Sequence, residues 1–202
     1  MSAPSFPPGG TLLDTFKKSF IDVPVDANKD NAISTTEFLE AAESLTTIFD
    51  ALGSTAFSPV KSDMLGNVKK IRDRLLEAPA DSATLQDLVK NDSKGNAVEA
   101  LAWLNRGLDF TCKALSKNVA NANEELSDSF REAYGQTLKP YHGMLVKPVF
   151  SLAMSACPYR KVFYEKLGDD TDKVQNELRP YLASLEKIVS LVKGFLPTKY
   201  TK

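Results

Sequence analysis

Apolar residues recur at intervals of three and four along almost the whole chain, and this spacing restricts the possible folds more than any other feature. Such a period places apolar side chains on one face of an α-helix, whereas a half-buried strand needs alternating apolar and polar residues. Leu12, Phe16 and Phe20 show the helical spacing, and runs of alternating β-branched residues do not occur. We therefore expect an all-α fold.

Capping residues and prolines indicate where the helices start and stop. Ser34 and Glu37 match a capping box, Ser-x-x-Glu, in which each side chain satisfies a free backbone amide. Ser58 followed by Pro59 is a favourable helix start, since proline fits the first helical turn. The predicted helices cover residues 11–21, 34–52, 58–78, 84–90, 96–117, 124–138, 141–156, 159–166 and 171–195.

The size of the chain suits a single domain. It has 202 residues, and 43% of them are hydrophobic, enough for a sizeable core. No internal repeat and no linker rich in Pro, Gly and Ser divides it, so we expect one domain over residues 1–202, with residues 1–10 as a disordered tail. Pro148 and Pro180 fall inside predicted helices and should bend or divide them.

Charge and targeting features exclude several classes of protein. Lys and Arg number 25 against 26 Asp and Glu, so no basic field would attract nucleic acid. No stretch approaches the ~18 apolar residues of a membrane span, so any membrane contact must be peripheral. Residues 1–10 do not resemble a signal peptide, and Cys112 and Cys157 are expected to be reduced thiols. We expect a cytoplasmic monomer.

Residues 26–37 match much of a calcium-binding EF-hand loop, with oxygen-bearing side chains at loop positions 1, 3, 5 and 9 and Glu at position 12. Three features oppose this interpretation. The glycine of position 6 is Asn31, Pro24 lies where the entering helix should run, and no second hand is visible. A polar loop closed by a helix cap explains the same residues, so we favour it and expect no bound metal.

The third predicted helix carries three polar side chains along one line. Asp63, Asn67 and Lys70 are spaced i, i+4 and i+7, so they project within a narrow arc. A solvated helix face with ordinary charge pairing is one explanation. The other is a site for a polyol, because a carboxylate accepts hydroxyl protons, an amide donates and accepts, and an ammonium donates.

The only tryptophan and the only histidine are further candidates. Trp103 is either a core residue or a flat apolar platform for the C–H face of a sugar ring. His142 is either an ordinary, partly buried histidine or the source of one directed hydrogen bond near neutral pH. The sequence alone leaves both alternatives open at each position.

Together these segments resemble the glycolipid transfer protein family. The pattern is Asp63-x-x-x-Asn67-x-x-Lys70, then Trp103 within Ala-Trp-Leu-x-Arg-Gly-Leu, then His142. The flanks, residues 57–68 and 145–161, are most similar to the fungal heterokaryon-incompatibility branch, and the resemblance covers residues 12–196. It implies a two-layer, all-α helical sandwich that opens between its layers to admit lipid chains.

The resemblance also implies roles for individual residues. Asp63, Asn67 and Lys70 would hydrogen-bond the sugar headgroup, and Trp103 would stack on it. His142 would bond the carbonyl of the ceramide amide, while Asp63 takes the amide N–H. The remaining positions are Arg106, which would brace this surface through a carboxylate, and Leu138, Phe150 and Phe49, which would line the hydrophobic pocket.

Headgroup type and membrane contact follow from two substitutions within the family pattern. A second branch carries phosphorylated ceramide and tends to have Lys and Arg where this chain has Asn67 and Trp103. A phosphate favours cations, whereas a neutral sugar suits an amide and an aromatic plane, so a glucosyl- or galactosylceramide is implied. Met144 replaces a membrane-docking tryptophan of mammalian-type members, and we expect it to contact the bilayer together with Tyr159.

These residues predict carriage of one glycosphingolipid between membranes, without catalysis and without a cofactor. Burial of each methylene is worth ~0.8 kcal/mol, which makes aqueous passage of a two-chain lipid feasible. A glycosidase ordinarily needs two opposed carboxylates, and only Asp63 is evident beside His142. A sensor that signals lipid occupancy in fungal self/non-self recognition needs the same pocket, so the sequence leaves transport and sensing open.

Overall fold

The computed structural model describes residues 6–53 and 55–201, most of which are helical. Short 3-10 helices accompany the α-helices: η1 Leu12–Thr15, η2 Phe20–Asp22, η3 Thr55–Phe57 and η4 Thr198–Tyr200. The α-helices are α1 Thr35–Leu45, α2 Ile48–Ala51, α3 Ser58–Glu77, α4 Leu85–Asn91, α5 Asn96–Ala120, α6 Leu126–Gln136, α7 Lys147–Ser155, α8 Arg160–Leu167 and α9 Thr171–Phe195.

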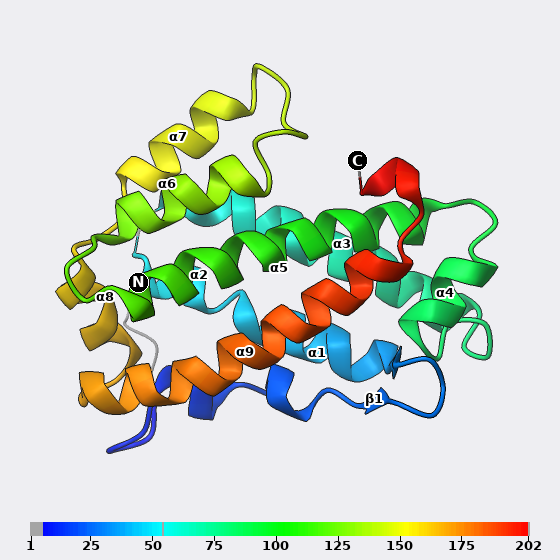
Figure 1. The fold of residues 1–202 in the computed structure, drawn as a ribbon, viewed down its shortest axis with the longest axis horizontal. Coiled ribbons are helices and arrows are strands. Elements are labelled where there is room, and N and C mark those ends of the chain that lie inside the picture. The colour runs from blue at the N-terminus through cyan, green and yellow to red at the C-terminus, as the bar shows by residue number, and fades with distance from the viewer. Residues whose placement is uncertain (1–5, 54, 202) are drawn as a thin grey trace.

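The helices form two layers, with α5 at the centre (Figure 1). α5 packs against α3, α6 and α9, and α3 packs in turn against α1. In the view of Figure 1, α1, α2 and α3 lie behind α5, α6 and α9. Apolar side chains are buried on most sides of α5 because it has neighbours in both layers. The predicted all-α, two-layer sandwich is confirmed.

Most predicted helices are present, and neither Pro148 nor Pro180 divides its helix. α9 covers the predicted residues 171–195, and Pro180 lies inside it without dividing it. Pro148 stands in the first turn of α7, where proline costs no helical hydrogen bond, so it does not divide that helix either. Residues 137–146 form turns in place of the helix expected from residue 141.

The prediction of a helix over residues 11–21 is wrong. Thr11 and Ser19 each cap a separate short turn by accepting a hydrogen bond from the amide two residues on, so η1 and η2 form instead. The apolar spacing still serves the core. Phe20 is buried edge-on against Tyr181 of α9, with ring centroids 6.0 Å apart.

Part of the tail expected to be disordered, residues 1–10, is folded onto the domain. The Gly10 amide donates to the Pro7 carbonyl over 2.8 Å. The Lys173 ammonium of α9 donates to a carbonyl of the same turn over 2.7 Å. These bonds order residues 7–10, whereas residues 1–5 lie outside the described part of the chain.

Ser34 occupies the N-cap of α1, but the predicted capping box is wrong. Its hydroxyl donates to the Glu37 carboxylate and caps no backbone amide. This bond lowers the pKa of the Glu37 carboxyl. The helix expected over residues 34–52 is divided between α1 and α2, where the hydroxyls of Thr46 and Thr47 bond to carbonyls three residues back.

The segment that resembles a calcium loop forms a β-hairpin. β1 (Val25–Asp26) pairs antiparallel with β2 (Ala32–Ile33). Asp30 and Asn31 turn the chain with φ angles of 53° and 55°, in the left-handed region that Asp and Asn tolerate. The short η2 precedes the hairpin, so residues 26–37 lack the entering α-helix of an EF-hand. The local geometry therefore contradicts the calcium-binding alternative.

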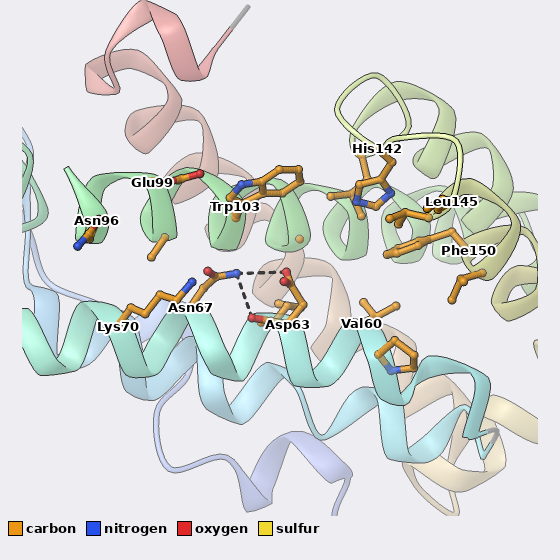
Figure 2. A pocket seen from close by; sticks show the side chains of 17 residues that line it. Val60, Asp63, Asn67, Lys70, Asn96, Glu99, Trp103, His142, Leu145 and Phe150 are labelled. Carbon is orange, nitrogen blue, oxygen red and sulfur yellow. Dashed lines mark hydrogen bonds between the residues drawn. The ribbon is translucent and has the colours of Figure 1, made fainter. Parts of the chain in front are cut away.

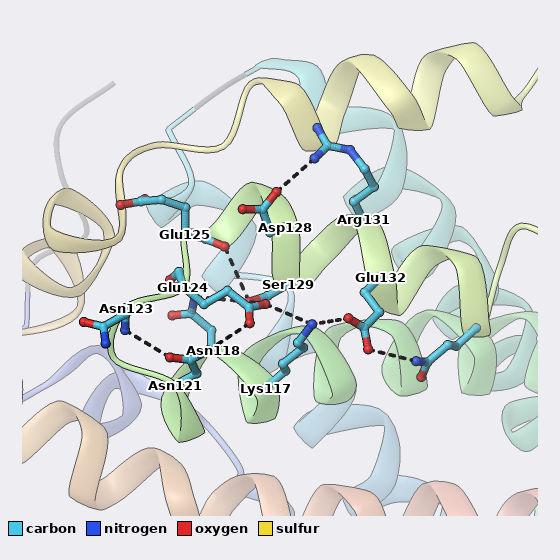
Figure 3. A network of polar contacts seen from close by, with 11 residues as sticks. Lys117, Asn118, Asn121, Asn123, Glu124, Glu125, Asp128, Ser129, Arg131 and Glu132 are labelled. Atoms are coloured by element: carbon cyan, nitrogen blue, oxygen red, sulfur yellow. Dashed lines mark hydrogen bonds and ion pairs between the residues drawn. The ribbon is translucent and has the colours of Figure 1, made fainter.

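A polar network fixes the turn between α5 and α6 (Figure 3). The Asn118 amide donates to the Glu124 carbonyl (2.9 Å) and the Ser129 hydroxyl (3.2 Å). It also accepts from the Tyr164 hydroxyl (3.0 Å). The Lys117 ammonium adds an ion pair with Glu124 at 3.2 Å. Because Asn118, Ser129 and Tyr164 are buried and hydrogen-bonded to one another, they fix the direction of α6, which leads into residues 137–146.

Candidate functional site

The predicted polar stripe lies on one face of α3, toward α5 (Figure 2). Asn67 is buried, and its Nδ2 donates to the Asp63 carbonyl (3.0 Å) and to the Asp63 carboxylate (3.1 Å). These two bonds orient the amide relative to the carboxylate. Within residues 6–53 and 55–201, no carboxylate pairs with Lys70 within 4.0 Å, so its ammonium is available to a ligand.

The Asp63 carboxyl stands at the rim of this stripe, where solvent still reaches it. Partial desolvation by the surrounding protein raises its pKa, while the Lys70 charge and the Asn67 hydrogen bond act in the opposite direction. An incompletely solvated carboxylate gains more from a ligand donor than a fully hydrated one does. The group is therefore suited to accept a hydroxyl or amide proton.

α5 supplies the opposite wall through Trp103, whose indole is partly buried against the core. The two helices approach closely at Gly107, where an added Cβ would lie 3.1 Å from Cγ of Met64 on α3. A larger residue at this position would displace Met64. Glycine thus helps set the spacing between the wall that carries Trp103 and the wall that carries Asp63.

His142 lies in the 137–146 loop, between two aromatic rings. Its imidazole stacks on Trp103 with centroids 5.9 Å and planes 19° apart, and lies 4.5 Å from the ring centroid of Phe150. Nδ1 is 3.2 Å from the Tyr134 hydroxyl. If that hydroxyl donates to Nδ1, the neutral ring carries its proton on Nε2, which can then donate to a ligand.

Arg106 lies behind the site and links three segments. Its guanidinium carbon is 3.7 Å from the ring centroid of Tyr141 and 4.5 Å from that of Trp103. Nη2 of Arg106 donates to the Tyr200 carbonyl over 2.7 Å. The hydrogen-bond partner that holds Arg106 in place is therefore a backbone carbonyl and not the predicted carboxylate. Burial lowers the pKa of His142, and the positive charge of Arg106 lowers it further, which favours the neutral imidazole.

These elements enclose a pocket of about 720 Å³ between α3, α5, the 137–146 loop and α7. Figure 2 shows that its character changes along its length. Polar side chains line one end: Asp63, Asn67, Lys70, Asn96 and Glu99. Apolar side chains line the other: Val60, Leu138, Leu145, Val146, Val149 and Phe150. Such a pocket matches an amphipathic ligand with a polar head and an apolar body.

Phe49, expected in the pocket wall, lies deeper in the core and is not a lining residue. It stacks on Phe57 with centroids 6.0 Å apart. The row of rings continues through Phe130 and Phe110 to Phe150, with successive separations of 5.7, 5.4 and 6.3 Å. The apolar end of the pocket therefore abuts a continuous aromatic core.

α5 also contributes two polar side chains that were not predicted, Asn96 and Glu99. Asn96, Glu99 and Trp103 have the spacing i, i+3 and i+7, the same signal that identified the stripe on α3. The signal is weak there because Asn and Glu are common in the first turn of any helix. Glu99 is thus a second carboxylate in the pocket, in addition to Asp63.

Exposed apolar side chains adjoin the apolar end of the pocket. Leu145 is 91% exposed, Met144 87% and Leu152 68%. Leu145 also lines the pocket, so the opening and the exposed surface are continuous. Tyr159, the other predicted membrane contact, is exposed as well, but it follows the far end of α7 and does not line the pocket.

The described residues contain no cluster of metal ligands and no activated thiol. They contain no group of three or more His, Cys, Asp or Glu able to hold a metal ion. Cys112 and Cys157 are free, and burial raises the pKa of each thiol to about 12, which disfavours the reactive thiolate. Over the same described residues, no helix combines the length and apolar character that crossing a bilayer requires.

Comparisons with known proteins show which family the chain belongs to. The sequence model of the glycolipid transfer protein family matches residues 33–169. A glycolipid transfer protein of Aureobasidium melanogenum is 61% identical over 201 residues, covering 98% of each chain. The crystal structure of HET-C2, a fungal glycolipid transfer protein, superimposes with a TM-score of 0.91 at 66% identity, covering 95% of this chain and all of that one.

A third relative is more distant. The structure of FAPP2, which selects simple glycosphingolipids with this fold, has a TM-score of 0.83 at 31% identity, covering 95% of this chain and 97% of that one. The similarity thus extends over most of the chain. The chain belongs to the glycolipid transfer protein family and is similar to its fungal members.

Proposed function

We propose that the protein binds one glycosphingolipid with a simple neutral headgroup and transfers it between membranes. The observation that carries this proposal is the pocket, whose polar and apolar ends meet beside Trp103 and His142. The names of the similar proteins support the same ligand class. No bond is broken in this function, so the protein acts as a carrier and not as an enzyme.

The headgroup would bind at the polar end. A sugar ring stacks its C–H face on Trp103, while the carboxylate of Asp63, the amide of Asn67 and the ammonium of Lys70 bond its hydroxyls. These groups supply both acceptors and donors, as a polyol needs. A lipid without hydroxyls would leave them unpaired, which is the physical basis of selection.

The ceramide amide would bind next to the headgroup. Asp63 accepts the amide N–H, and Nε2 of His142 donates to the amide carbonyl. The Tyr134 hydroxyl near Nδ1 and the lowered pKa of His142 both support the neutral tautomer that this bond requires. One amide, recognised from both sides, fixes the depth at which the lipid enters.

The hydrocarbon chains would leave the amide toward Phe150. The pocket ends at the aromatic row that runs from Phe150 to Phe49, so long chains require these rings to separate. Each methylene that enters gains ~0.8 kcal/mol from leaving water, and this gain offsets the cost of parting the layers. The layered architecture suits such a movement because the row lies between its helices.

The exposed apolar cluster would contact the membrane. Met144, Leu145 and Leu152 can insert shallowly beside the pocket opening, so a lipid can pass without crossing water. Residues 133–164 contain no Asp or Glu but include Lys147 and other cations, which avoids repulsion from a bilayer surface. We place the protein in the cytoplasm as a monomer, where its free thiols fit a reducing environment.

A transfer assay between vesicles tests the proposal. Donor vesicles carry fluorescent glucosylceramide or fluorescent phosphatidylcholine, and recovered lipid is checked for an intact glycosidic bond. We expect rapid glucosylceramide transfer, little phosphatidylcholine transfer and unchanged lipid. Trp103→Ala and Asp63→Val should abolish transfer while circular dichroism keeps its helical signal. Equal transfer of both lipids, or wild-type rates in both variants, would contradict the proposal.

A further inference from the structure

The turn before α7 holds a methionine at the surface of the protein. The Gly143 carbonyl accepts hydrogen bonds from the amides of Val146 (3.1 Å) and Lys147 (3.3 Å), so the turn is closed by its own backbone. Met144 and Leu145, at the tip of this turn, are 87% and 91% exposed. Figure 1 shows the segment projecting from the body of the molecule. The backbone bonds thus hold the Met144 side chain in solvent.

The other methionines that the structure describes are protected. Met64 and Met154 are 1% and 2% exposed and belong to the hydrophobic core. Met1, the fourth methionine, lies outside the described residues. A thioether is oxidised when the oxidant can reach its sulfur, so exposure decides which side chain reacts. Of the three described methionines, Met144 is therefore the one that is open to oxidation.

The position of Met144 separates membrane contact from ligand binding. With Leu145 and Leu152 it forms the exposed apolar cluster beside the pocket opening. Met144 itself does not line the pocket, whereas His142 and Leu145, which are near it in the chain, do. An oxygen atom added to Met144 would therefore alter the surface beside the opening and leave the cavity unchanged.

Oxidation converts this apolar side chain into a polar one. Hydrogen peroxide transfers one oxygen atom to the sulfur: an S–O bond forms from a sulfur lone pair, the O–O bond breaks, and water leaves. The sulfur is oxidised and the peroxide is reduced. The product, methionine sulfoxide, accepts hydrogen bonds, so its transfer from water into an apolar environment is unfavourable.

We propose that Met144 is a reversible oxidation site, and that its sulfoxide form disfavours membrane docking. The thioether inserts into the bilayer beside the pocket opening, whereas the sulfoxide keeps the same turn in water. A methionine sulfoxide reductase reverses the change: the oxygen leaves as water, and two thiols become a disulfide. This inference rests on the proposed function, because it concerns the membrane contact of that carrier.

Peroxide treatment followed by a transfer assay tests the inference. Wild type and Met144→Leu are exposed to hydrogen peroxide, catalase removes the excess, and peptide mass spectrometry locates each added oxygen. The rate of fluorescent glucosylceramide transfer between phosphatidylcholine vesicles is then compared with the rate of the same protein before treatment. Met144→Leu is the matched control, because it keeps an apolar side chain at the tip of the turn and retains the other three methionines and both cysteines.

Two further measurements separate docking from ligand binding and from folding. The single tryptophan, Trp103, lies in the pocket, so its fluorescence reports the binding of a short-chain glucosylceramide that is added without vesicles. The melting temperature reports folding. Because Met144 neither lines the pocket nor belongs to the core, we expect both quantities to be the same before and after its oxidation.

We expect peroxide to oxidise Met144 before Met64 and Met154, and to slow wild-type transfer roughly fivefold, because the partial burial of one apolar side chain is lost. Met144→Leu should keep its untreated rate. Methionine sulfoxide reductases for both sulfoxide epimers, supplied with dithiothreitol, should restore the wild-type rate. Met144→Gln should transfer more slowly than Met144→Leu without any oxidant, because its side chain is polar.

The outcomes separate this inference from the function on which it rests. Unchanged wild-type transfer after complete oxidation of Met144 would overturn the inference and leave the carrier function intact. An equal loss in Met144→Leu would overturn it too, since the effect would then belong to another residue, as would a loss of short-chain lipid binding equal to the loss of transfer. Failure of untreated wild type to transfer glucosylceramide would instead contradict the proposed function.

Discussion

The indole of Trp103 stacks on the imidazole of His142, with ring centroids 5.9 Å and planes 19° apart, although one residue belongs to α5 and the other to the loop before α7. The proposed sugar platform and the proposed amide donor are thus in direct contact. Phe150, at the start of the aromatic row, touches the same imidazole. A ligand that engages one of these rings must fit the positions of the others.

Replacement of Trp103 by smaller side chains should weaken ligand binding, and more so as more aromatic surface is lost. We expect Trp103→Phe to bind glucosylceramide more weakly than wild type, and Trp103→Ala to bind at least about tenfold more weakly than Trp103→Phe, because a phenyl ring still offers a stacking face. Isothermal titration calorimetry measures this without relying on the removed fluorophore. Indistinguishable affinities for the two variants would show that the ring is not a platform.

Replacement of Arg106 by lysine should loosen the link between α5, the loop and Tyr200. The ammonium keeps the charge but cannot stack on Tyr141 while it donates to the Tyr200 carbonyl, so we expect a loss of about 1–2 kcal/mol in the free energy of unfolding. Urea denaturation followed by circular dichroism measures it. Arg131→Lys, in an exposed ion pair, is the matched control and should change little. Equal stabilities of the two variants would argue against the link.

Acidification should destabilise the fold through the partly buried His142. Burial and the nearby cations lower its pKa below 6.5, so the unfolded chain binds this proton more readily than the folded chain. The free energy of unfolding should therefore be unaffected well above pH 6.5 and should fall as the pH drops through that value. The pKa of Asp63 is raised above 3.8, so protonation of this carboxyl favours the folded state, opposite to the effect of His142, and it does so at lower pH.

Melting temperatures of wild type and His142→Gln between about pH 7.5 and pH 5.5 isolate this effect, because only wild type carries the histidine. We expect the wild-type melting temperature to fall more steeply on acidification. Parallel curves for the two proteins would mean that protonation of His142 is not coupled to folding.

The aromatic row should contribute strongly to stability. Phe130 is fully buried and contacts Phe57 and Phe110, so Phe130→Ala should lower the free energy of unfolding by about 3–5 kcal/mol through lost burial and a cavity. Leu76→Ala, at a residue that is 72% exposed, should cost less than about 0.5 kcal/mol. Chemical denaturation of both variants checks the contrast, and a cost below about 1 kcal/mol for Phe130→Ala would contradict the packing described.

Helical periodicity was sufficient to predict the fold class and most of the helices. It failed where local hydrogen bonds competed with the helix. Thr11 and Ser19 each cap a short turn in place of a helix. Asp30 and Asn31 reverse the chain into a β-hairpin, although the sequence there has no alternating apolar pattern. Such features depend on side-chain bonds over two or three residues, which apolar spacing does not record.

The site was predictable where its residues share one helix and less so where distant segments meet. Asp63, Asn67 and Lys70 follow from spacing on α3, but their meeting with His142 depends on the 137–146 loop, for which a helix was expected. Phe49 was placed in the pocket by resemblance, yet its ring packs in the core. Tertiary packing decides which of two apolar residues faces a cavity, and one sequence does not contain that information.

A crystal structure of the protein with bound galactosylceramide tests the central claim most directly. The account predicts the sugar ring stacked on Trp103 with hydroxyls bonded to Asp63 and Lys70, the amide between Asp63 and His142, and the chains leading past Phe150. A lipid bound elsewhere, or one whose sugar lies at the apolar end of the pocket, would contradict it.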